Sequence, residues 1–182
     1  MDIERKHFIM FSFINSIIIF AGLVAYIFIW NWIVIHVDLT ALQQFEAGAV
    51  YTVQSLFGVP VEMTNPTILH YAAPAQGFDV EIIALCTGIG EILFFIFLVM
   101  LFRGVEWHAK LKGLGVFIPV IFIMNLLRLV LIYPLALWFG IEAMWGIHWF
   151  FWKYGTFIIL MIFFSLWYLL IAKKDLQSRL QK

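Results

Sequence analysis

The stretch GLGVFIPVIFIMNLLRLVLIYPLAL, residues 113–137, is almost entirely apolar and contains one arginine, Arg128. A bilayer core of about 30 Å is crossed by roughly 20 helical residues at 1.5 Å each, so this stretch is long enough to span a membrane. Three further runs have similar length and character, at residues 8–35, 81–102 and 154–172. With 64% hydrophobic and 12% charged residues, a chain of 182 residues exposes apolar surface to lipid rather than burying all of it. The sequence therefore predicts an all-α polytopic membrane protein with about four transmembrane helices.

The region between the first two runs, residues 36–80, is less hydrophobic and is predicted to lie outside the membrane. In residues 39–57, apolar side chains recur at helical spacing with glutamines and one glutamate between them. This pattern indicates an amphipathic helix, either at the membrane interface or packed on the bundle. The following stretch, TILHYAAPAQGFDVEII (residues 67–83), has two alternating runs around Pro74–Gly77 and predicts a short β-hairpin. We expect residues 1–182 to form a single integral membrane domain.

The distribution of basic residues predicts the topology. If the N-terminus is cytoplasmic and there are four spans, nine Lys and Arg residues lie inside and one, Lys153, lies outside; the nine are Arg5, Lys6, Arg103, Lys110, Lys112, Lys173, Lys174, Arg179 and Lys182. Basic residues concentrate on the cytoplasmic side of membrane proteins. Counting residues 39–57 as a fifth span would reverse this asymmetry. We therefore expect a multi-pass protein of the cell membrane with both termini in the cytoplasm.

In this topology, three chain segments bring reactive side chains to the extracytoplasmic side. Cys86, the only cysteine, lies at the start of the second span, Arg128 lies near the outer end of the third, and His148 lies in the predicted outer loop before the fourth. A nearby cation and a helix N-terminus both lower a thiol pKa, which would make Cys86 a nucleophile. A histidine can carry the thiol proton, and a guanidinium can stabilise an oxyanion. These residues are the predicted catalytic group.

Three more residues are candidates for binding or orienting a substrate. Asn125 precedes Arg128 by one helical turn and shares its face, and Gly88 keeps the cysteine segment thin for the approach of another backbone. Glu91 is the other charge well inside a span, so it is a candidate partner for Arg128. Neutral net charge argues against nucleic acid as a partner, and neither the cysteine count nor the histidine spacing indicates a metal or other cofactor.

Structural explanations compete with each catalytic assignment. A single cysteine in an apolar segment is most often packing, and Arg128 and Glu91 can form a purely structural ion pair. His148 stands among tryptophans and can be a residue of the interfacial aromatic belt, a substrate contact or a proton carrier.

The combination of LCTGIGE (residues 85–91), NLLR (residues 125–128) and His148 resembles the exosortase and archaeosortase family of membrane-embedded cysteine transpeptidases. The resemblance covers residues 77–168. It implies cleavage of surface proteins at a C-terminal sorting signal, which consists of a short motif, a membrane helix and a basic tail, and transfer of the new carboxyl end to a membrane lipid or another acceptor. It also implies that Cys86 is the nucleophile, Arg128 the essential arginine and His148 the third site residue.

Two other functions remain compatible with the residues alone. One is an intramembrane cysteine protease that releases its product to water. The other is a non-enzymatic transporter or scaffold, in which Arg128 and Glu91 line a polar path or lock helices together. The scarcity of water in an apolar site favours transfer over hydrolysis.

Overall fold

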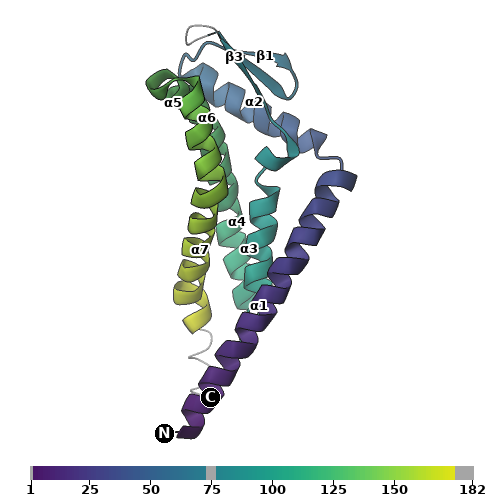
Figure 1. Cartoon of the computed structure of the whole chain (residues 1–182), viewed down its shortest axis with the longest axis vertical. Coiled ribbons are helices and arrows are strands. Elements are labelled where there is room, and N and C mark those ends of the chain that lie inside the picture. The colour runs from purple at the N-terminus through teal and green to yellow at the C-terminus, as the bar shows by residue number, and fades with distance from the viewer. Residues whose placement is uncertain (1, 73–76, 175–182) are drawn as a thin grey trace.

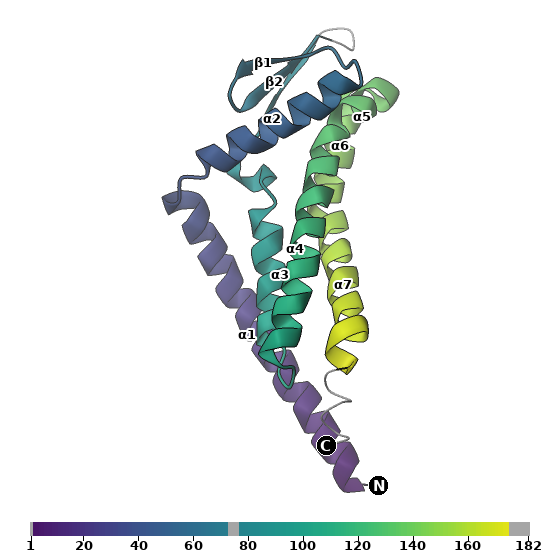
Figure 2. The same ribbon diagram turned by 180° about the vertical axis from the view of Figure 1, so that it is seen from behind.

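The computed structural model describes residues 2–72 and 77–174 and is mostly helical. The elements are, in chain order, α1 (Asp2–His36), α2 (Thr40–Leu56), β1 (Val61–Asn65), β2 (Ile68–Tyr71), β3 (Phe78–Glu81), a 3-10 turn η1 (Ala84–Cys86), α3 (Ile89–Leu101), α4 (Trp107–Val130), α5 (Ile132–Phe139), α6 (Ile141–Phe150), a π-helical segment η2 (Phe151–Gly155), α7 (Thr156–Trp167) and a second π-helical segment η3 (Tyr168–Ala172). The long helices form a bundle, and α2 and the sheet cover one of its ends (Figures 1 and 2). This architecture confirms the predicted all-α polytopic membrane fold.

Within the described residues, three helical stretches are long and apolar enough to cross a bilayer: Phe13–His36, Trp107–Phe139 and Ile141–Ala172. They correspond to the first, third and fourth predicted spans. The predicted second span contains α3, which is apolar but has only 13 residues. At 1.5 Å per residue, α3 covers about 20 Å and is shorter than the hydrocarbon core.

The start of the second span was predicted wrongly. The span was expected from residue 81, but Glu81 ends β3, and helix α3 begins only at Ile89. Gly88 precedes α3 with φ +66°, in the left-handed region that glycine adopts readily. A β-carbon at Gly88 would also lie 3.0 Å from the Cβ and Cγ atoms of Asn125. The tight turn at Gly88 therefore separates the cysteine segment from the helix.

The predicted loop between the last two spans is also wrong. Residues 141–172 are helical throughout, since α6, η2, α7 and η3 follow one another without a break. The tryptophans and glycines of this region suggested an interfacial loop. Instead, the π-helical segment η2 keeps the chain helical through Phe151–Gly155. His148 consequently lies on a helix.

The outer region contains the predicted amphipathic helix and the predicted hairpin. Helix α2 confirms the first, and β2 pairs with β3 antiparallel, with Ile68 opposite Glu81 and Tyr71 opposite Phe78. Most of the predicted turn, residues 73–76, lies outside the described residues. Strand β1 was not predicted, because only the first of its five residues is buried and the apolar alternation is absent. It adds a third strand, in the order β1-β2-β3.

Helix α2 directs two of its polar residues toward the protein. Glu46 and Gln54 are buried along it, together with Ala47 and Val50, whereas the apolar Leu56 is 80% exposed. Gln54 has its polar atoms satisfied, because it donates to the Val130 carbonyl at 3.0 Å and accepts a hydrogen bond from the Tyr71 hydroxyl at 2.8 Å. In a protein surrounded by lipid, polar side chains are most stable where protein groups pair with them. Glu46 and Gln54 therefore lie on the face of α2 that covers the end of the bundle, where Cys86 is located.

Candidate active site

Cys86 ends the 3-10 turn that leads into α3. It is half-buried, and its backbone N–H donates to the Ile83 carbonyl at 2.8 Å. The neighbouring Thr87 is fully buried and donates its hydroxyl to the Ala84 carbonyl at 2.8 Å. These local hydrogen bonds fix the turn, so the thiol is held on a defined backbone between the sheet and the bundle.

Asn125 joins the cysteine turn to helix α4. Its side chain is 6% exposed, and Nδ2 donates to the Cys86 carbonyl oxygen at 2.7 Å. The same nitrogen lies 3.5 Å from Oε1 of Glu46 on α2. Asn125 was predicted to orient Arg128 or a bound peptide, and in the structure its side chain instead contacts the backbone of Cys86. Gly88 also lies against Asn125, so the close neighbour that requires this glycine is a side chain of the same chain rather than a second backbone.

Arg128 lies one turn beyond Asn125 and forms an ion pair with Glu91. The Nη1 and Oε1 atoms are 3.7 Å apart, and the two side chains are 13% and 14% exposed. This is the ion pair that the sequence offered as a structural explanation for Arg128. Within the described part of the chain, the Nε and Nη2 atoms of Arg128 are buried and have no hydrogen-bond partner. Buried guanidinium donors are normally satisfied, so Arg128 retains hydrogen-bonding capacity for another group.

His148 approaches the same region from α6. It is half-buried, its ring packs edge-on against Trp145 with centroids 6.0 Å apart, and it lies within electrostatic range of Arg128. Cys86, too, is in range of Arg128. Arg128 is thus a common neighbour of Cys86 and His148, and His148 approaches it on a helix rather than a loop.

The expected lowering of the thiol pKa is not observed. Burial raises the pKa of Cys86 above its ordinary value, and the carboxyl groups of Glu46 and Glu91 add to this effect. A backbone hydrogen bond at Ile83 and the charge of Arg128 lower the pKa only in part. The resting thiol is therefore protonated at neutral pH, and an attack by its sulfur requires a group that takes the proton.

Glu46 belongs to this cluster and was not among the predicted site residues. It is fully buried, and electrostatic interactions couple it to Arg128, Glu91 and Cys86. The helical pattern of α2 placed Glu46 among ordinary polar positions. Glu46 is the single carboxylate among the glutamines of this helix, but the sequence does not show which face of α2 is buried.

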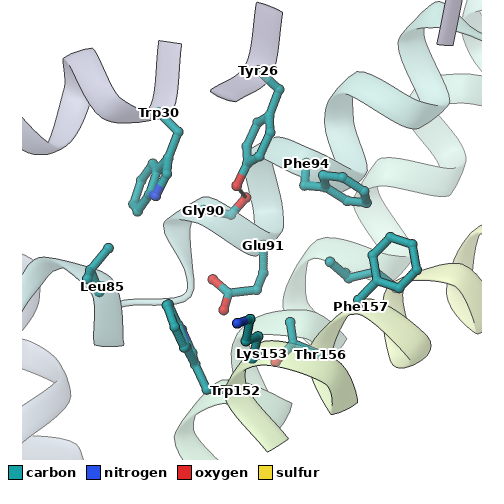
Figure 3. Close-up of a pocket in the computed structure, with 11 residues that line it drawn as sticks. Tyr26, Trp30, Leu85, Gly90, Glu91, Phe94, Trp152, Lys153, Thr156 and Phe157 are labelled. Atoms are coloured by element: carbon teal, nitrogen blue, oxygen red, sulfur yellow. Dashed lines mark hydrogen bonds between the residues drawn. The ribbon is translucent and has the colours of Figure 1, made fainter. Parts of the chain in front are cut away.

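A pocket of about 280 Å³ lies beside this cluster (Figure 3). Glu91 reaches into it from α3, with Tyr26 and Trp30 of α1 on one side and Trp152 and Lys153 of η2 on the other. Leu85, next to Cys86, also lines it. The Tyr26 hydroxyl donates to the Gly90 carbonyl at 3.1 Å, which ties α1 to the first turn of α3. The pocket is mainly apolar and contains one acidic and one basic side chain.

Three kinds of side chain that acyl-transfer enzymes use occur in this region. A thiol stands on a fixed turn, a buried cation has open donors, and an imidazole lies in the same region. Among residues 2–72 and 77–174, no group of three or more His, Cys, Asp or Glu side chains is placed to hold a metal ion.

The sequence was compared with known proteins at three levels. No curated protein and no solved structure shows a significant match to the chain. The family model described as "Transmembrane exosortase (Exosortase_EpsH)" matches residues 12–168, which is most of the chain and includes Cys86, Arg128 and His148. Because the match extends from within α1 to the start of η3, the chain belongs to the transmembrane exosortase family.

Proposed function

We propose that this chain is a membrane cysteine transpeptidase that processes surface proteins at a C-terminal sorting signal. The observation that carries the proposal is the hydrogen bond from Asn125 to the Cys86 carbonyl, one helical turn from a buried Arg128 with two open donors. In this arrangement the cysteine lies near a cation that has hydrogen-bond donors with no partner in the described residues. Membership of the exosortase family supports the same class of reaction.

In the proposed reaction, Cys86 loses its proton to His148, and the sulfur attacks the scissile carbonyl carbon. The oxygen of the tetrahedral intermediate accepts hydrogen bonds from Arg128, whose Nε and Nη2 donors have no partner in the described residues. The C–N bond then breaks, and the leaving amine takes the proton from His148. The remaining acyl group is bound to sulfur as a thioester.

In the second step, an amine or hydroxyl acceptor attacks the thioester and restores the thiol. The proposed acceptor is a membrane lipid or another surface molecule. The pocket beside Glu91 is mainly apolar, which supports transfer over hydrolysis because little water accompanies the thioester.

The placement of the elements supports the predicted orientation. The start of α1 and the end of η3 lie at one end of the molecule, and α2, the sheet and the cysteine turn lie at the other (Figure 1). With cytoplasmic termini, Cys86 faces the extracytoplasmic side. A substrate helix with a basic cytoplasmic tail would then present its scissile bond near the cysteine turn. The β2–β3 hairpin is the proposed contact for the extended motif, by strand addition.

The chemistry of the product tests this function. We expect a host surface protein with a short motif, membrane helix and basic tail to be shortened in cells that express the chain, with an acceptor attached to its new C-terminus. Mass spectrometry of the C-terminal peptide measures this directly. A free carboxylate there would instead establish a hydrolytic protease. If the host surface protein keeps its full length, both enzymatic functions are contradicted. The non-enzymatic transporter or scaffold then remains as the function.

A further inference from the structure

Glu46 is unusual among the buried polar residues of α2. It is 0% exposed, and in the part of the chain that the structure describes its Oε2 atom has no hydrogen-bond partner. Its other oxygen lies 3.5 Å from Nδ2 of Asn125, the long limit for a hydrogen bond. Gln54, two turns along the same helix, is equally buried but makes hydrogen bonds with Val130 and Tyr71. The shortage of hydrogen bonds to the Glu46 carboxyl group is therefore specific to its position above the cysteine turn.

Asn125 connects Glu46 to the nucleophile. An amide nitrogen carries two hydrogens, and the Nδ2 atom of Asn125 directs one toward the Cys86 carbonyl and one toward Glu46. An acceptor at Glu46 therefore favours the amide orientation in which nitrogen, not oxygen, faces the cysteine turn. With no acceptor at position 46, the hydrogen bond to the Cys86 carbonyl would hold this orientation alone.

The charges around Glu46 determine its protonation. The titratable groups that face it are Cys86 on η1, Glu91 on α3 and Arg128 on α4; on the sheet side, Tyr71 of β2 bonds to Gln54 instead. Arg128 already has an ion-pair partner in Glu91, so a second carboxylate would give the group a net negative charge. Such a charge opposes the formation of a thiolate and of an oxyanion.

We propose that Glu46 is a positioning residue of the transpeptidase site, which works in its protonated form by orienting Asn125 against the cysteine turn while leaving Arg128 free for the oxyanion. The inference rests on the proposed function. When Glu46 loses its proton, it becomes a competing partner for Arg128, and the site is switched off. Burial, more than the carboxyl of Glu91, raises the pKa of Glu46 to about 8, although Arg128 and the Asn125 hydrogen bond lower it in part. Glu46 is therefore protonated at pH 7 and ionises as the pH rises through about 8.

The test compares Glu46→Gln with the wild-type chain across pH. Glutamine keeps an acceptor for Asn125 and cannot ionise. For a single group with a pKa of about 8, the protonated share falls about tenfold between pH 7 and pH 9. We therefore expect the ratio of the Glu46→Gln rate to the wild-type rate to rise by about tenfold over this range. The full-length chain is assayed in open membrane fragments with the same host surface protein, so that both membrane faces meet the buffer.

Two further variants distinguish a positioning role of Glu46 from a general effect of removing a carboxyl group. Glu62→Gln changes an exposed carboxyl on β1 and should give a ratio that does not vary with pH. Glu46→Ala removes the acceptor and should lower the rate by about tenfold or more at pH 7, since small misplacements near reacting atoms have large effects. Restoration of the rate by Glu46→Gln supports positioning.

A flat ratio for Glu46→Gln with an active wild type would overturn this inference while leaving the transpeptidase function intact. An inactive wild type would count against the function itself. If Glu46→Gln does not accumulate in the membrane, Glu46→Leu, which also cannot ionise, replaces it in the pH comparison. Failure of both to accumulate would show that Glu46 serves folding alone and would overturn the inference.

Discussion

Cells that carry Cys86→Ala should leave their sorting-signal protein at full length, with a processing rate reduced by about 10³-fold or more, because the nucleophile is absent. Cys86→Ser should be equally inactive. A serine hydroxyl is far less acidic than a thiol and needs a base matched to it, and burial already disfavours ionisation at this position. Immunoblots of the substrate in membrane fractions measure the unprocessed share.

The control for this substitution is the adjacent Thr87→Ser. Thr87 is fully buried, and serine keeps the hydroxyl that donates to the Ala84 carbonyl. This variant should process its substrate normally and should accumulate in the membrane to the same level as Cys86→Ala. Normal processing by both Cys86 variants would exclude a thioester mechanism.

The second large effect is expected at Arg128. In Arg128→Lys the positive charge opposite Glu91 remains, but the planar donors of the guanidinium are lost. Removal of an oxyanion donor lowers the rate by about 10²–10³-fold, so we expect a defect of that size with a normal protein level. The rate and the amount of chain in the membrane are measured together.

Arg128→Ala should behave differently from Arg128→Lys. It leaves Glu91 buried without its cation, which destabilises the bundle as well as the reaction, so its membrane level should fall. Arg103→Lys, at an exposed arginine between α3 and α4, is the matched control and should be active. If Arg128→Lys processes substrate at the wild-type rate, Arg128 is a structural cation and the proposed oxyanion role is wrong.

The long helices could be predicted because length and hydropathy alone define them. The bounds of the 13-residue helix α3 could not be predicted in this way. The apolar run starts at Ile82, whereas the helix begins only after the turn at Gly88. Residues on both sides of that turn are apolar, so hydropathy does not mark the boundary. The left-handed glycine and its contact with Asn125 depend on tertiary packing.

The candidate site, too, could be predicted from the sequence only in part. Helix geometry predicted that Asn125 and Arg128 share one face, and the structure joins this face to the cysteine turn through the hydrogen bond from Asn125 to the Cys86 carbonyl. Glu46 was missed because its role depends on which face of α2 meets the bundle. The thiol pKa was predicted in the wrong direction because the sequence reveals the nearby cation but not the degree of burial or the second carboxyl.

The central claim is that Cys86 carries the cleaved protein as a thioester. The most direct measurement is peptide mass spectrometry of the full-length chain, acid-quenched during turnover with its sorting-signal substrate and then digested. The account predicts an acyl adduct on the peptide that contains Cys86, which neutral hydroxylamine releases, and its absence from Cys86→Ala. Active processing with an unmodified Cys86 peptide, or with the adduct on another residue, would contradict it.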